Sequence, residues 1–171
     1  YMAAGDIQPF QDARTASAAS ALSFFVKAGS KGADGTVSRI KAGEPVTKAA
    51  GATGVLAAVT NSPTTTLRIV GVAASTSTET ATADGSVSVI PAMPGQIWMI
   101  APKVAATWDT QSEYNALVGS RVLLDNTSGT YTILATDGAG NGCIVEYIDV
   151  VKYPGMVAFS FSPTCNYAIL G

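Results

Sequence analysis

The acidic side chains are the residues of this 171-residue chain whose spacing could support catalysis. Paired carboxylates can act as acid and base on a glycosidic bond, and the pairs that fit this role are Asp109 with Glu113 and Asp137 with Glu146. Histidine, the side chain best suited to proton transfer near neutral pH, is absent. A structural role fits the acids better, because Asp109 and Glu113 fall in the first turn of a predicted helix and Asp137 falls in a predicted turn. We therefore expect a protein that is not an enzyme.

No cofactor or metal is expected either. The glycine-rich residues 137–142 lack the spacing of phosphate-binding loops, so we interpret them as a hairpin connection. Their oxygens, with those of Asp125 and Asn126, could bind calcium, but the repeated acidic pattern of a calcium loop is missing. Cys143 and Cys165 do not have metal or redox spacing, and we expect both to be buried, with a disulfide between them as the alternative.

The aromatic side chains could stack on sugar rings, which would make the chain a carbohydrate-binding module. They are spread over predicted strands and the predicted helix, and no single loop gathers them. Core packing is therefore the favoured interpretation. The residues concerned are Trp98, Trp108, Tyr114, Tyr131, Tyr147, Tyr153 and Tyr167.

The composition indicates a folded chain with few charges. Hydrophobic residues make up 47% and charged residues only 13%, with a net charge of −2, which excludes the disordered class. Such a weakly charged surface is unusual for a free monomer and is typical of a surface buried in an assembly. Without a basic cluster we expect no direct binding to nucleic acid. Without an apolar run of about 20 residues we expect no membrane span.

Alternation and turn residues predict a mainly β chain with one short helix. The helix is expected within residues 107–118, with Asp109 or Thr110 as N-cap and Gly119 as its stop. The polar residues 75–83 are expected to form a surface loop. Strands are predicted at residues 36–40, from 46, and at 55–59, 67–74, 86–90, 96–101, 121–124, 131–135, 143–151 and 156–161.

These elements suggest small β-barrel or β-sandwich-like units behind an extended N-terminal arm. We assign residues 1–35 to the arm, 36–95 to a first β domain and 96–171 to a second, mostly β unit packed on the first. Within the arm, Leu22, Phe24 and Val26 alternate with other residues and predict a short strand. That strand either adds to a sheet edge elsewhere or is the first strand of the domain.

Residues 38–89 resemble the head decoration, or cement, proteins of tailed bacteriophages. The resemblance rests on the order strand, K-x-G-x-P-V, alanine and glycine run, V-G-V-A, polar loop, D-G-x-V-x-V. These are turn and strand residues without a catalytic fingerprint, so the resemblance concerns fold and role. They are Lys41, Gly43, Pro45, Val46, Gly71, Val72, Ala73, Asp84, Gly85, Val87 and Val89.

The resemblance implies a structural virion protein on the outer capsid surface. It would bind the major capsid protein, assemble with itself as a homotrimer, and stabilise the capsid lattice. We expect removal of residues 1–27 to leave a folded domain that no longer joins capsids. A phage tail or receptor-binding β protein and a carbohydrate-binding module are the alternatives.

The predicted capsid contacts are apolar residues of the arm, because apolar side chains on a terminus have no evident core to join. The loop of residues 75–83 is a second candidate. The arm residues are Phe10, Leu22, Phe24, Phe25 and Val26.

Overall fold

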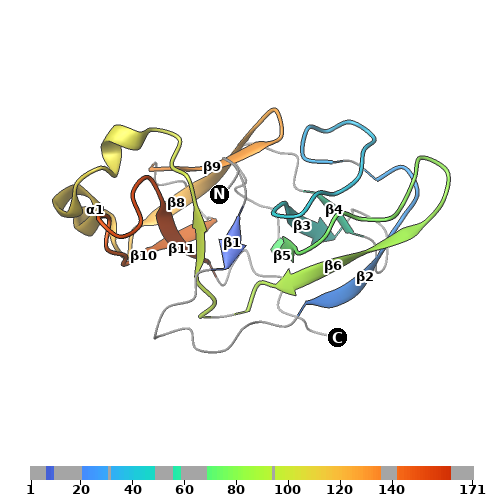
Figure 1. Cartoon of the computed structure of the whole chain (residues 1–171), viewed down its shortest axis with the longest axis horizontal. Coiled ribbons are helices and arrows are strands. Elements are labelled where there is room, and N and C mark those ends of the chain that lie inside the picture. The colour runs from blue at the N-terminus through green and yellow to red at the C-terminus, as the bar shows by residue number, and fades with distance from the viewer. Residues whose placement is uncertain are drawn as a thin grey trace.

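The chain folds into two curled, mainly antiparallel sheets that lie side by side, with one short α-helix (Figure 1). The computed structural model describes residues 7–9, 21–30, 32–48, 56–58, 69–93, 95–135 and 142–162. The predicted fold class, small barrel- or sandwich-like β units with one short helix, is confirmed. In the described residues no helix is both long and apolar enough to cross a bilayer.

The N-terminal sheet has five strands, all paired antiparallel. In spatial order they are β2 (Leu22–Val26), β6 (Gly85–Pro91), β5 (Ile69–Ala73), β3 (Pro45–Lys48) and β4 (Leu56–Ala58). Val87 and Val89 of β6 are buried while Ser86 and Ser88 are more exposed, which is the alternation expected of a strand covered on one face. The sheet curls until its two outer strands, β2 and β4, approach each other.

A glycine allows the close approach of β5 and β6. A Cβ atom on Gly71 would lie 2.2 Å from the carbonyl oxygen of Ile90 and 2.7 Å from the side chain of Val89. Real Cβ atoms do not come that close, so only glycine fits here without a shift of β6. This contact gives a physical reason for the glycine in the V-G-V-A motif.

The C-terminal sheet has six strands. Their spatial order is β1 (Gln8–Pro9), β7 (Trp98–Ile100), β11 (Val157–Phe161), β10 (Cys143–Glu146), β8 (Arg121–Thr127) and β9 (Thr130–Leu134). The chain beyond β7 pairs in parallel with β9, where Lys103 N donates to Ile133 O at 2.8 Å and Ile133 N donates to Ala101 O at 3.1 Å. The five strands from β7 to β9 therefore close into a small barrel. All three residues of β7 are buried, so this strand is covered on both faces.

The described part of the N-terminal segment is built into both sheets. Strand β1 pairs with β7 in the C-terminal sheet, and β2 pairs with β6 over five residues, from Leu22 opposite Val89 to Val26 opposite Gly85. Two interpretations were open for the strand that contains Phe24 and Val26. The structure shows it as the first strand of the N-terminal sheet. Removal of residues 1–27 would take away both strands, so we now expect this cut to destabilise the fold.

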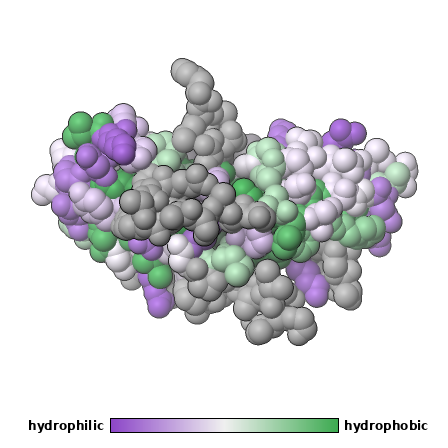
Figure 2. Space-filling view, turned by 60° about the horizontal axis from the view of Figure 1, so that its bottom comes forward, coloured by the Kyte–Doolittle hydropathy of each residue, from purple (hydrophilic) through white to green (hydrophobic). Residues whose placement is uncertain are grey.

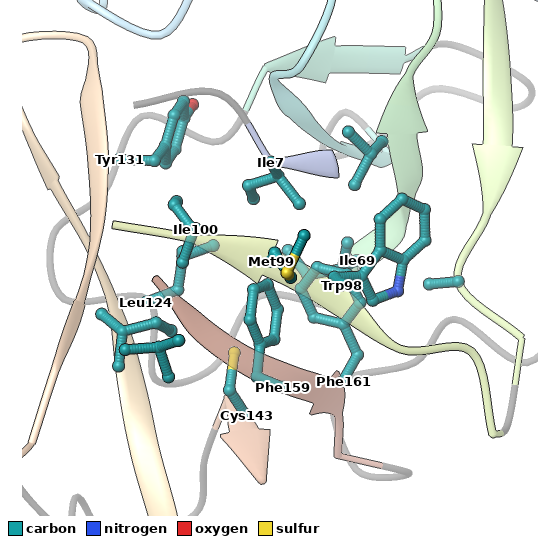
Figure 3. Packing of buried hydrophobic residues seen from close by; sticks show 14 of the residues in the cluster. Ile7, Ile69, Trp98, Met99, Ile100, Leu124, Tyr131, Cys143, Phe159 and Phe161 are labelled. Carbon is teal, nitrogen blue, oxygen red and sulfur yellow. The ribbon is translucent and has the colours of Figure 1, made fainter. Parts of the chain in front are cut away.

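One hydrophobic core runs through both sheets (Figure 3). Ile7, just before β1, is 2% exposed and belongs to the same cluster as Ile100 of the barrel and Ile69 of the N-terminal sheet. Phe159 and Phe161 of β11 pack edge to face, with ring centroids 5.3 Å apart. Because this core is continuous, each sheet stabilises the other.

The helix forms where the sequence predicts it. Helix α1 (Gln111–Leu117) follows a short 3-10 helix (Ala105–Thr107). Thr110 is the N-cap, and its hydroxyl oxygen accepts a hydrogen bond from Glu113 N at 3.3 Å. Gly119, with φ of +81°, ends the helix in the left-handed conformation that glycine adopts most easily.

Three of the predicted loops and strands differ in the structure. Strand β8 continues through Asp125 and Asn126, and the hairpin turn is Ser128–Gly129, with φ of 51° and 87°. Positive φ at both central positions matches the twist of the flanking strands, so two residues suffice for the turn. Residues 36–40 form no strand although Ile40 is fully buried, and strand β10 ends at Glu146, short of the predicted residue 151.

Candidate interaction surface

The acids that were considered for catalysis have structural contacts. A hydrogen bond with Glu113 raises the pKa of Asp109, and a hydrogen bond from Thr110, at 2.6 Å, lowers the pKa of Glu113. Both therefore belong to the N-terminal cap of α1. Glu146 Oε1 accepts a hydrogen bond from Ser160 Oγ at 2.8 Å, and Asp137 lies outside the described residues.

Four of the aromatic residues pack in the core. Trp98, Trp108, Tyr114 and Tyr131 are each at most 3% exposed, so they form no platform for a sugar. Tyr114 donates to the carbonyl oxygen of Glu146 at 2.9 Å, and burial raises the pKa of both tyrosines. The other three tyrosines differ from these. Tyr147 is exposed, Tyr153 is half-buried, and Tyr167 lies outside the described residues.

Of the oxygens considered for calcium, those of Asp125 and Asn126 have partners within the protein, whereas residues 137–141 lie outside the described residues. Asp125 Oδ2 forms an ion pair with Lys103 Nζ at 2.8 Å and accepts a hydrogen bond from Thr127 Oγ1 at 2.9 Å. Asn126 Nδ2 donates to the carbonyl oxygen of Ala33 at 2.8 Å. Within the described ranges no three His, Cys, Asp or Glu side chains gather as a metal site would require.

The cysteines can be placed only in part. Cys143 is buried in strand β10, as predicted. Cys165 lies outside the described residues, so the alternative of a disulfide between them stays a prediction.

The predicted contact residues divide between surface and core. Leu22 and Phe25 are each 47% exposed, whereas Val26 is fully buried and Phe24 packs against the core. Strand β2 pairs with β6, and because side chains alternate between the two faces of a strand, Phe24 and Val26 point inward. The arm interpretation did not foresee the core that these two side chains join. Val26 therefore has no surface to offer a partner in this fold, and Phe10 lies outside the described residues.

Strand β2 lies at an edge of the N-terminal sheet. Its described pairing is with β6 on one side. We call Leu22, Ser23 and Phe25 the β2 edge, since these are its exposed side chains. Sheet edges that carry apolar side chains are ready templates for contact with another chain.

Other exposed apolar residues are scattered over the molecule. Figure 2 shows that on one face hydrophobic residues form small groups among hydrophilic ones rather than one broad patch. In the described ranges the large exposed apolar residues outside the β2 edge are Val37, Met93, Val104, Val118, Tyr147 and Val151.

The predicted surface loop of residues 75–83 contains no strand or helix, but part of it is buried. Ser77 and Glu79 are 1% and 2% exposed. Ser77 N donates to Ile40 O at 2.9 Å, and its hydroxyl accepts from Ile40 N at 2.8 Å. Gly29 N donates to Thr80 O at 3.0 Å. These bonds fix the loop against residues 27–40.

Glu79 is a candidate that the sequence analysis missed. Among the described residues neither of its carboxylate oxygens has a hydrogen-bond partner, although both are buried. It lines an open hollow of about 250 Å³ together with residues of both loops, among them Ser30, Ser38 and Arg39. Its only signal in the sequence is that it is the one charged residue in the polar run 75–83.

Comparison with protein-family models, with curated proteins and with solved structures found no match to this chain.

Proposed function

We propose that the chain is a structural virion protein that binds the outer surface of a tailed-phage capsid and stabilises the lattice of major capsid protein. The observation that carries the proposal is the β2 edge, where Leu22 and Phe25 present apolar surface on an edge strand. The acids and aromatics that suggested enzymatic or sugar-binding roles are, where described, largely used for capping and core packing.

The motif residues support the proposal through the fold. Gly71 allows the approach of β6, and Gly43, with φ of +85°, makes the turn before β3. Asp84 Oδ1 accepts a hydrogen bond from Ala28 N at 2.8 Å and so holds the end of β2. The residues that resemble decoration proteins thus build the sheet that carries the β2 edge.

The proposed mechanism is mechanical. Each copy contributes a modest apolar contact at the β2 edge, and association of copies, as a homotrimer, raises the effective concentration of every further contact. Binding of many copies would then join neighbouring capsid subunits without a tight single site.

The test is co-sedimentation of the full chain with expanded capsids that lack their own decoration protein. Saturable binding at a fixed ratio to capsid subunits is expected, and light scattering gives the oligomeric state of the free chain. A Leu22→Ser/Phe25→Ser variant should lose binding. Val151→Ser, at a position 85% exposed in the other half of the molecule, is the matched control and should bind normally. Equal occupancy by the double variant and the original chain would refute a role of the β2 edge.

A further inference from the structure

A buried acid without a partner marks a second site on the N-terminal half. Glu79 is 2% exposed, and both of its carboxylate oxygens lack a hydrogen-bond partner within the part of the chain that the structure describes. Buried polar groups in folded proteins are nearly always hydrogen-bonded, and a buried carboxylate is especially unfavourable alone. A carboxylate held in this state is suited to receive a group that brings hydrogen-bond donors and positive charge.

The surroundings of Glu79 are held in place before any ligand arrives. The two loops that border the hollow are joined by the bonds from Ser77 to Ile40 and from Gly29 to Thr80. Below them, Gly85 passes so close that a Cβ atom there would lie 2.2 Å from Glu79 N. The backbone around Glu79 is therefore ordered before binding, which favours affinity, whereas the buried carboxylate must turn toward the hollow to reach a ligand.

The volume of the hollow and the groups that line it limit which kind of ligand can bind there. A volume of about 250 Å³ is below the range of pockets for whole small-molecule ligands and suits a single side chain. A metal ion would need several oxygen ligands, and the described residues contain no acidic cluster that supplies them. A carboxylate with two unused oxygens matches the paired donors of a guanidinium group.

We propose that the Glu79 hollow binds the guanidinium group of an arginine side chain presented by a partner protein. Arg39 also lines the hollow, is exposed, and forms no ion pair among the described residues. It is placed to contact an acidic group next to the incoming arginine. That the partner is the capsid protein rests on the proposed function, whereas the guanidinium site itself does not.

The probe for this site is arginine blocked at both ends, titrated into the isotope-labelled full chain and followed by NMR. Saturable shifts are expected at the amides of Ser38, Glu79 and Thr80. Blocked citrulline has the same shape without the charge, and it should bind at least tenfold more weakly, since a charge-assisted hydrogen bond contributes about 1.5–3 kcal/mol. Blocked lysine tests whether the paired donors matter and should also bind more weakly.

Two variants separate binding from folding. Glu79→Gln should weaken the blocked arginine at least tenfold and raise the melting temperature of the free chain, because it removes a buried charge that has no partner. Asp109→Asn removes one negative charge on the other half of the molecule and is the control. It should not change the binding of blocked arginine, and Glu79→Gln should change binding and melting temperature in the same direction with or without it.

Several outcomes would overturn the site. Absence of saturable shifts would mean that the hollow holds only water. Equal binding of blocked lysine or of citrulline would contradict recognition of a guanidinium group. A lower melting temperature for Glu79→Gln would show that Glu79 has a stabilising partner within the chain, such as Arg39. None of these results depends on capsids, so failure of the proposed function and failure of this site are distinguishable.

Discussion

Substitution of Val26 by alanine tests whether β2 is a structural strand or a dispensable arm. Val26 is fully buried and pairs with Gly85 of β6. Loss of two methyl groups removes about 1.6 kcal/mol of transfer free energy at about 0.8 kcal/mol per group. The cavity that remains raises the expected loss in the free energy of unfolding to about 2–3 kcal/mol. Such a loss is large beside the usual stability of about 5–15 kcal/mol, yet the variant should still fold.

The assay is urea unfolding followed by tryptophan fluorescence, since Trp98 and Trp108 are both buried and will report their exposure to water. With a slope of about 2 kcal/mol/M, the midpoint should fall by about 1–1.5 M. Phe25→Ala, on the opposite face of the same strand, is the matched comparison and should lose only about 1 kcal/mol because half of its side chain is already exposed. A midpoint for Val26→Ala within about 0.3 M of the original chain would refute the structural assignment of β2.

Three further changes test other parts of the fold. Gly71→Ala should lower the free energy of unfolding by about 1–3 kcal/mol, because its Cβ would meet the carbonyl oxygen of Ile90 at 2.2 Å, and urea unfolding will measure it. Thr110→Ala should cost about 1 kcal/mol through loss of the hydrogen bond to Glu113 N, while Thr110→Ser, which keeps the hydroxyl, should be nearly neutral in the same assay. Burial raises the pKa of Glu44, so the folded state binds its proton more tightly than the unfolded state does. The stability from this group should be complete below the unfolded pKa of about 4.3 and be lost as pH rises through the folded pKa. Unfolding of Glu44→Gln across pH 4–7 should lack this fall, and identical pH profiles would contradict it.

Local patterns predicted the elements that depend on their own residues. The alternation of Val87 and Val89 with serines marked β6, and Thr110, Glu113 and Gly119 marked the helix and its end. These features depend on neighbours within a few positions in the chain. They could therefore be identified without knowledge of the fold.

Long-range contacts explain what the sequence left open. Asp125 and Asn126 are typical turn residues, but Lys103 and the carbonyl oxygen of Ala33, far away in the chain, hold them in a buried strand. The burial of Val26 likewise depends on β6, about 60 positions later. Periodicity shows that a strand exists but does not show which strand lies beside it.

The residues of the candidate site could also be predicted only in part. Apolar residues in the segment before residue 28 pointed to a contact surface, and Leu22 and Phe25 do have exposed surface there. Glu79 could not be predicted, since its burial arises only where two loops meet. A single acid in a run of serine and threonine is otherwise typical of a solvated loop.

The β2 edge and the Glu79 hollow are consecutive along the chain, which bears on how a partner would bind. Strand β2 ends at Val26, and the residues that follow it reach the hollow at Ser30. The bond from Ala28 N to Asp84 Oδ1 fixes this connection at the start of β6. One partner segment that covers the edge would thus bring its next residues towards the hollow. Two modest contacts joined in this way act at high effective concentration, so loss of either one should weaken binding by about 10²–10⁴-fold.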